Sequence, residues 1–312
     1  MASKANPTDT RRENLRRRTW GMRMALWTVL FAATGVFIVF VVLSGGNSDE
    51  DGVPESRFDP IHKFGTADYH SLAFNPTEEN VVLFGHHGGV QMSQDAGENW
   101  ETVIDEQGRD AMNLVYDPFS PETIFMAGHN VYYRSSDAGQ SWQEVTTDLP
   151  GLDLHAFAAS PAHEGRFYAF SAGYGLFQSD DAGSTWALAV PQAPQGTNSI
   201  VELPDGTLIL GATDQGILRS DDGGATWTQS RNGIDVGAIY AVKGDPAGER
   251  LYAGTDYGVY VSTDGGSTWS KTSLDDTWVV AVGVAPNEPL SVLAINRNGQ
   301  LYRSTDGGET WE

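Results

Sequence analysis

Cysteine is absent from the 312-residue sequence, which excludes disulfide bonds and metal sites built on thiolates. The motifs of several large enzyme classes are absent too: there is no phosphate-binding P-loop, no G-x-S-x-G elbow and no H-E-x-x-H zinc motif. Basic residues are few, with 19 Lys and Arg against 41 Asp and Glu, and the net charge is −22. A chain this acidic repels nucleic acid, so we expect no nucleic-acid partner.

One stretch of the sequence is long and apolar enough to cross a membrane. Residues 24–43 contain no charged side chain, and at about 1.5 Å per residue a helix of this length spans a hydrocarbon core of about 30 Å. Seven basic and two acidic side chains precede it in residues 1–23. Because basic flanks stay in the cytoplasm, we predict a single-pass cell-membrane protein with residues 1–23 cytoplasmic and the C-terminal body extracytoplasmic. A cleaved signal peptide is the alternative, but its apolar segment is usually only about 7–15 residues long.

An eight-residue pattern, S-x-D-x-G-x-[TSN]-W, occurs six times in the C-terminal body. Its tryptophans recur every 41–44 residues, and a constant period of about 40–50 residues predicts a β-propeller with one repeat per blade. The Asp can accept hydrogen bonds from its own turn, the Gly permits a positive φ, and the Trp can pack between neighbouring sheets. We therefore interpret the following residues as structural: Asp95, Asp137, Asp181, Asp222, Asp264 and Asp306, with Trp100, Trp142, Trp186, Trp227, Trp269 and Trp311.

The pattern resembles the Asp-box, or BNR, repeat of sialidases, sortilin-type receptors and photosystem II assembly factors, over roughly residues 58–312. The resemblance implies a propeller fold but no single function, because proteins with unrelated activities carry this repeat. Each period also contains four short apolar runs, which predicts four strands per blade. We predict an all-β, six-bladed β-propeller with Asp-box turns over residues 58–312, preceded by one transmembrane α-helix and a flexible, Gly-, Ser- and acid-rich linker over residues 44–57.

The sixth repeat ends one residue after Trp311, where a fourth strand would begin. A propeller closes its ring of blades and leaves only short, protected strand edges. We therefore predict that residues 58–64 supply the missing outer strand of the sixth blade and join the first blade to the last.

The resemblance to sialidases implies that ligands bind the face opposite the Asp boxes. This face would carry the hairpins between second and third strands and the segments that enter each first strand. Aligning the repeats places histidines and aspartates of the first three blades on it: Asp68, His70, His86, His87, Asp110, His129, Asp153 and His155. We expect this set to form a binding face for a polar or basic partner. The alternative is that these side chains only form turns and cap strand ends.

No metal or cofactor is predicted, with a divalent metal ion as the alternative because His and Asp are suitable ligands. All ligands of such an ion must lie about 2.0–2.2 Å from it. We expect equivalent turns on adjacent blades to be too far apart for this, so that only His70 with His86 or His87 would be neighbours.

The sequence favours a membrane-anchored binding or assembly module with a protein or carbohydrate partner, because loops on a rigid scaffold suit binding. The alternative is a glycoside hydrolase, other than a sialidase, with its site at the channel mouth opposite the boxes. Such an enzyme needs two carboxylates about 5–5.5 Å or 6.5–9.5 Å apart. A sialidase is not expected, because R-F-D-P at residues 57–60 departs from the F-R-I-P motif of that family. The candidate arginines are also scattered over three blades (Arg109, Arg231 and Arg297).

Overall fold

The computed structural model describes residues 56–66, 68–105, 109–190, 193–234, 237–286 and 290–312. The chain divides into two compact units, residues 1–49 and 50–312, and the described residues belong to the second. No helix among the described residues is long and apolar enough to span a membrane. The predicted cytoplasmic tail of residues 1–23, the predicted helix of residues 24–43 and residues 44–55 of the predicted linker lie outside the described residues.

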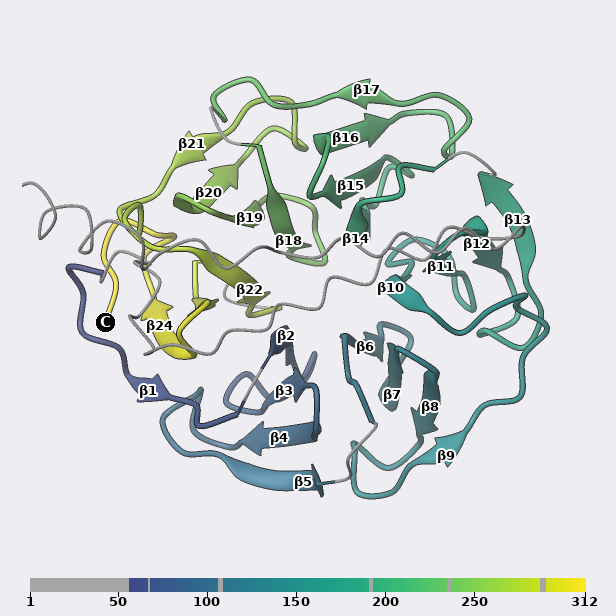
Figure 1. Cartoon of the computed structure of the whole chain (residues 1–312), viewed down its shortest axis with the longest axis horizontal. Coiled ribbons are helices and arrows are strands. Elements are labelled where there is room, and N and C mark those ends of the chain that lie inside the picture. Colours follow the sequence, from purple (N-terminus) through teal and green to yellow (C-terminus); the bar gives the residue numbers. More distant parts are fainter. Residues whose placement is uncertain (1–55, 67, 106–108, 191–192, 235–236, 287–289) are drawn as a thin grey trace, which may run out of the picture. The chain divides into compact units, whose positions relative to one another are not determined.

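The described strands form six four-stranded antiparallel sheets around a common axis, which confirms the predicted six-bladed, all-β propeller (Figure 1). The first strands, nearest the axis, are β2 (Tyr69–Phe74), β6 (Asn113–Asp117), β10 (Leu154–Ala159), β14 (Thr197–Glu202), β18 (Ile239–Gly244) and β22 (Val279–Val284). The second strands are β3 (Val82–His86), β7 (Ser120–Gly128), β11 (Phe167–Ser171), β15 (Leu208–Ala212), β19 (Leu251–Thr255) and β23 (Val292–Asn296).

The third strands lead into the Asp boxes, and the fourth strands follow them at the rim. The third strands are β4 (Gly89–Ser93), β8 (Val131–Ser135), β12 (Gly175–Ser179), β16 (Gly216–Ser220), β20 (Gly258–Ser262) and β24 (Gln300–Ser304). The fourth strands are β5 (Glu101–Asp105), β9 (Gln143–Glu144), β13 (Ala187–Val190), β17 (Thr228–Gln229), β21 (Ser270–Lys271) and, in the sixth blade, β1 (His62–Lys63).

The ring closes where β1 pairs with β24, so the N-terminal end of the propeller completes its last blade (Figure 1). His62 lies opposite Leu301, and Ile61 N donates a hydrogen bond of 2.9 Å to Leu301 O. Phe64 N donates to Gly299 O, also over 2.9 Å. The predicted pairing of residues 58–64 beside the third strand of the last blade is therefore confirmed, with the hydrogen-bonded part confined to residues 61–64.

Six apolar clusters fill the junctions between adjacent sheets. The second strands β3, β11, β15, β19 and β23 are buried at every residue, because a neighbouring sheet covers each of their faces. An Asp-box tryptophan packs in each cluster; Trp269, for example, is only 3% exposed and packs with Ile209 of the preceding blade and Leu251 of its own. The cluster around Phe84 and Leu293 joins the first blade to the sixth.

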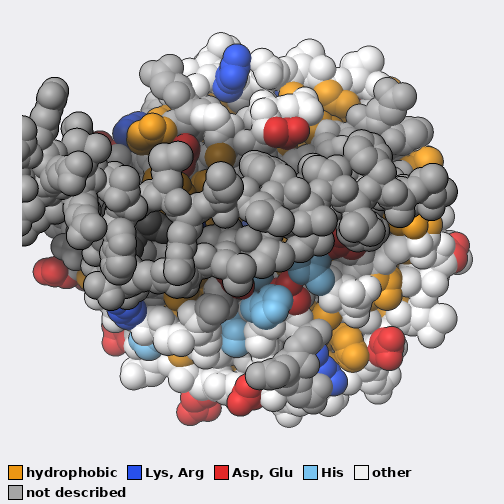
Figure 2. All heavy atoms as spheres, viewed as in Figure 1, with side chains coloured by type: hydrophobic (Ala, Val, Ile, Leu, Met, Phe, Trp, Pro, Cys, Tyr) orange, Lys and Arg blue, Asp and Glu red, His pale blue; other side chains and the backbone are white. Residues whose placement is uncertain are grey.

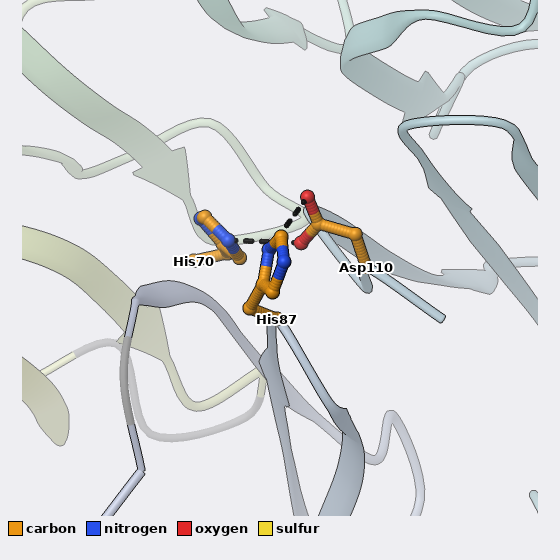
Figure 3. Close-up of side chains that lie close together, drawn as sticks. All are labelled: His70, His87 and Asp110. Carbon is orange, nitrogen blue, oxygen red and sulfur yellow. Dashed lines mark ion pairs between the residues drawn. The ribbon is translucent and has the colours of Figure 1, made fainter. Parts of the chain in front are cut away.

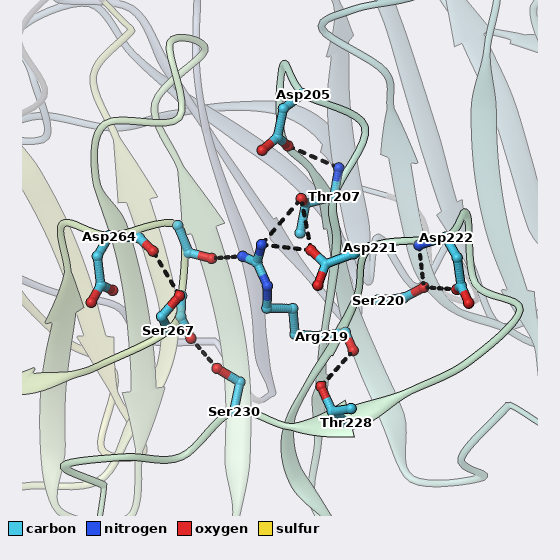
Figure 4. Close-up of polar contacts among 12 residues, drawn as sticks. Asp205, Thr207, Arg219, Ser220, Asp221, Asp222, Thr228, Ser230, Asp264 and Ser267 are labelled. Atoms are coloured by element: carbon cyan, nitrogen blue, oxygen red, sulfur yellow. Dashed lines mark hydrogen bonds and ion pairs between the residues drawn. The ribbon is translucent and has the colours of Figure 1, made fainter.

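Each Asp box is a turn held together by its own side chains, and Figure 4 shows Ser220 and Asp222 of the fourth box. In the fourth box, Ser220 Oγ and Thr226 N both donate to Asp222 Oδ1 over 2.8 Å. Thr226 Oγ1 donates to Asp222 Oδ2 over 2.7 Å, and these bonds from Thr226 and Ser220 lower the pKa of Asp222 to about 2. Gly223 and Gly224 have φ of 68° and 91°, which L side chains rarely adopt. The serine and main-chain bonds to the carboxylate recur in the other five boxes.

Polar contacts also join adjacent blades beside the boxes. Figure 4 shows Arg219, from β16, between Asp221 of its own blade and the box of the next. Its guanidinium pairs with Asp221 over 2.6 Å and donates to the carbonyl oxygen of Gly265. Ser230 Oγ donates to the carbonyl oxygen of Gly266 in the same turn. The box turn of the fifth blade is therefore held from the fourth blade as well as from within.

Phe64 directly follows β1, so replacing it tests how much the closing segment contributes to stability. Its ring is 4% exposed, with its centroid 4.1 Å from that of Phe84 and 5.2 Å from that of Trp100. We predict that Phe64→Ala lowers the free energy of unfolding by about 3–5 kcal/mol, as measured by urea denaturation followed through tryptophan fluorescence. Lys63→Ala, at the exposed position in β1 that precedes Phe64, is the control and should change it by less than about 0.5 kcal/mol. Equal effects of the two substitutions would show that β1 does not hold the ring closed.

Candidate binding face

Histidine and acidic side chains gather on the face of the propeller opposite the Asp boxes. Figure 2 shows them side by side on the side of the molecule seen in Figure 1. The predicted site residues lie before or within first strands (Asp68, His70, Asp110, Asp153 and His155) and at or after the ends of second strands (His86, His87 and His129). The structure connects six of these eight side chains in one network, which we call the His/Asp network: His70, His87, Asp110, His129, Asp153 and His155.

Asp110 is the centre of the first half of this network, and its side chain is only 4% exposed. Its Oδ1 lies 2.9 Å from His70 Nε2, and its Oδ2 lies 3.3 Å from His87 Nδ1 and 2.6 Å from His129 Nδ1. Figure 3 shows His70 and His87, both from the first blade, converging on Asp110 at the entry to the second. Burial raises the pKa of Asp110, but the contacts to His70 and His129 outweigh it and hold the pKa at about 2. Asp110 is therefore a fixed negative charge among three histidines.

The second half of the network surrounds Asp153. Its Oδ1 lies 3.2 Å from His129 Nε2 and 3.0 Å from His155 Nε2, and the two histidine nitrogens are 3.3 Å apart. The main chains of His129 and Asp153 form a β-bridge, and Asn130 N donates to Leu152 O over 2.8 Å. His129 thus joins a carboxylate of the second blade to one of the third, and main-chain hydrogen bonds hold it in place.

The expectation that only His70 with His86 or His87 would be neighbours is wrong, because side chains of adjacent blades also meet. At the first two junctions, the hairpin of one blade lies against the segment that enters the next blade's first strand. Ala111 N donates to His86 O over 3.2 Å at the first such junction. Two groups of three therefore have all their ligand atoms within 4.8 Å of one another: His70, His87 and Asp110, and His129, Asp153 and His155.

Two predicted residues lie outside the network. His86 is 7% exposed at the end of β3, where its Nδ1 accepts a hydrogen bond of 3.0 Å from Gly88 N. Burial, with the nearby His70, lowers the pKa of His86. Asp68 has a φ of 57° and lines a neighbouring pocket.

That pocket has a volume of about 460 Å³ and borders the network through His70. It is lined by Asp68, Tyr69, His70, Tyr240, Trp278, Val280 and Arg297. The Arg297 guanidinium lies over the Trp278 ring, 4.8 Å from its centroid. Asp68 is the only carboxylate among these lining residues, so they do not include the carboxylate pair of a glycoside hydrolase.

Tyr240 was missed by the sequence analysis, although the repeat contained the signal for it. His70, His155 and Tyr240 each stand six residues before the proline of the turn after the first strand. The repeat alignment therefore assigns Tyr240 the same position in its blade as the two histidines.

The opposite end of the channel, on the side of the Asp boxes, holds a second pocket of about 200 Å³. Apolar side chains such as Phe157, Val201 and Val284 line it, together with the prolines that follow the first strands. Lys243, from β18, is the one basic residue among its lining residues, and burial lowers the pKa of Lys243 to about 8.

The chain matches the family model of the BNR/Asp-box repeat at residues 260–271 and 302–312, which cover the fifth and sixth boxes. Together with the fold and the six box turns, this match confirms the resemblance to Asp-box propellers. No curated protein matches the chain.

Solved structures share the fold at low sequence identity. The GH74 xyloglucanase from Xanthomonas campestris is 18% identical with a TM-score of 0.56, and the match covers 83% of this chain and 46% of that one. The Niastella koreensis GH74 enzyme is 17% identical with a TM-score of 0.61, and the match covers 82% and 46% of the two chains. The chain thus spans about half the length of these enzymes. YCF48 bound to D1 peptide is 18% identical with a TM-score of 0.53, and here the match covers 84% and 86%.

Lys243 allows a test of how burial in the pocket on the Asp-box side affects its charge. Its folded pKa, about 8, is below the unfolded value of about 10.4, so the unfolded chain binds more protons between these pH values. The free energy of unfolding should therefore rise with pH across this window, and the full penalty should apply below pH 8. We predict that Lys243→Met stabilises the protein at pH 7 by up to about 3 kcal/mol and removes this rise. Lys271→Met, at an exposed position, is the control and should do neither.

Proposed function

We propose that this BNR/Asp-box propeller is a membrane-anchored binding or assembly module that holds a polar partner on the face carrying the His/Asp network. The observation that carries the proposal is the continuity of that network across three blades, with an open pocket of about 460 Å³ at its edge. His70 belongs to both, so a single partner can contact the charged groups and the aromatic pocket together.

The contacts in the network support partner binding over turn formation. Turn formers bond to their own main chain, as the box aspartates do. Asp110 instead contacts His70 and His87 of the preceding blade. His87 and Asp153 keep 61% and 52% of their side chains exposed, so they are available to a partner. With a net charge of −22, the chain attracts basic rather than acidic groups.

The comparison with YCF48 is compatible with this role. That protein is described as bound to a peptide, and its length corresponds to that of this chain. The likeness is one of fold, and a fold hosts many functions, so the argument depends on the residues of the face itself.

A glycoside hydrolase is the second candidate, and the pocket favours it in one respect. Tyr240 and Trp278 offer aromatic surfaces of the kind that stack on sugar rings, and Asp68 is a carboxylate beside them. The GH74 neighbours are glycoside hydrolases of about twice the matched length. Asp68 lacks a second carboxylate among the described lining residues, so we rank hydrolysis below binding.

Affinity capture tests the binding face. The full-length protein in mild detergent should retain a partner from its own membrane, and His87→Ala with His129→Ala should reduce that capture at least about 10-fold, as the loss of a central contact does. Thermal unfolding should stay close to that of the unchanged protein. His163→Ala is the matched control, because His163 lies beyond the opposite end of its first strand, after β10, and is 49% exposed. Capture that survives the double substitution would place the binding surface elsewhere.

An activity assay on the same full-length protein distinguishes a glycoside hydrolase from a binding module. Release of reducing ends from a xyloglucan or β-glucan oligosaccharide, abolished by Asp68→Asn, would establish catalysis and displace the binding proposal.

The absence of cysteine allows a direct test of the proposed topology, in which residues 24–43 form the anchor and residues 1–23 face the cytoplasm. In intact cells, a membrane-impermeant maleimide should label the single-cysteine variant Ser48→Cys, and should label Ser3→Cys only after lysis. Labelling of Ser3→Cys in intact cells would reverse the orientation. Loss of residue 3 from the mature protein would indicate a cleaved signal peptide instead.

A further inference from the structure

The second half of the His/Asp network has the geometry of a metal site. His129 Nε2, His155 Nε2 and Asp153 Oδ1 are separated pairwise by 3.3, 3.0 and 3.2 Å. Two ligands of a tetrahedral ion with bonds of about 2.0–2.1 Å lie roughly 3.3–3.4 Å apart. The three atoms therefore already form nearly one face of such a tetrahedron. We propose that these three side chains bind one divalent transition-metal ion of the zinc class.

The donor set agrees with this class of ion. Two imidazoles and one carboxylate suit Zn²⁺ and its neighbours, whereas Mg²⁺ and Ca²⁺ prefer sites made of oxygen atoms. His129 and His155 present the same nitrogen, Nε2, to the position of the ion, and Asp153 presents one oxygen.

Asp110 supplies the second feature of a built site, an orienting carboxylate. Its Oδ2 lies 2.6 Å from Nδ1 of His129, so the Nδ1 proton is donated to Asp110 and the lone pair of Nε2 points towards Asp153 and His155. Carboxylates in this position commonly fix the tautomer and the ring orientation of a metal-bound histidine.

The backbone holds the ligands in place without metal. His129 and Asp153 face each other across a β-bridge, and Ala172 N donates to Asp153 O over 2.8 Å. The side chains of His129, Asp153 and His155 remain 45%, 52% and 32% exposed. One side of the ion is therefore open to solvent, where water or a group of a partner completes the coordination. An exposed ion with an open coordination position suits the binding of a partner through the metal more than it suits stabilisation of the fold.

The first half of the network is the weaker candidate. Its His70 and His87 approach different oxygens of Asp110, at 2.9 and 3.3 Å, so they do not converge on one point as closely. Asp110 is also occupied with orienting His129. We therefore expect one ion per chain.

Metal titration of the full-length protein tests the site without any partner. The protein, purified without a histidine tag and freed of metal with EDTA, is titrated with Zn²⁺ by calorimetry and with Co²⁺ by visible spectroscopy. We expect about one Zn²⁺ per chain, the d–d bands of a four-coordinate Co²⁺ complex, and weaker binding in acid, because a metal ion binds only deprotonated ligands.

Variants identify the ligands. His155→Ala and Asp153→Asn should abolish stoichiometric binding, and Asp110→Asn should weaken it about 10–100-fold while all three ligands stay in place. His163→Ala, remote from this network, is the matched control and should bind like the unchanged protein. Thermal unfolding of the metal-free variants shows that each one is folded.

Two results would overturn the assignment: no stoichiometric uptake of Zn²⁺ or Co²⁺, or uptake that survives His155→Ala but is lost in His87→Ala. The metal site and the proposed partner binding can fail separately. Capture that is unchanged in EDTA would leave the binding face intact without metal, and zinc uptake without any captured partner would leave the metal site intact.

Discussion

The propeller depends on the packing of each sheet against both of its neighbours. Second strands such as β3 and β15 are buried at every residue, so no blade covers its own apolar surface. The blades must therefore form a closed ring, and β1 closes it beside β24. The Asp-box turn places a tryptophan at every junction. Hydrogen bonds within the turn hold the box aspartate, as those from Ser220 and Thr226 to Asp222 show. Because the boxes serve this packing, the opposite face is free to differ from blade to blade.

The same packing creates the His/Asp network. The sheets are arranged around one axis, and at the first two junctions the hairpin of one blade lies against the entry to the first strand of the next, as the bonds from Ala111 N to His86 O and from Asn130 N to Leu152 O show. Side chains far apart in the sequence meet at these two junctions. The first three blades fill these positions with histidine and aspartate, whereas Tyr240, Trp278 and Arg297 line the pocket on the other side of His70. A repetitive scaffold thus carries a face whose chemistry is not repetitive.

Negative charge is the common physical feature of the uses proposed for this face. Asp110 stays ionised in a nearly buried position because histidines surround it, and Asp153 presents a second carboxylate to solvent. Such a pair needs positive charge nearby, which protonated histidines, a metal ion or a basic partner can each supply. Because Asp153 and His87 are exposed, a basic partner can reach this face. Because His129 and His155 converge, a metal ion can bind between them.

The sequence by itself determined the number of blades, the four-strand pattern and the closing strand, because the boxes are local turn signals at a constant spacing and the missing fourth strand can be counted. It also assigned the eight candidate side chains to one face, since the position of a residue within the repeat determines at which end of a strand it lies. The distances between blades did not follow, because they depend on how the sheets tilt and pack around the axis. Only the tertiary structure therefore decided that Asp110 meets histidines of two blades, that Asp68 lines a pocket instead, and that His86 is buried.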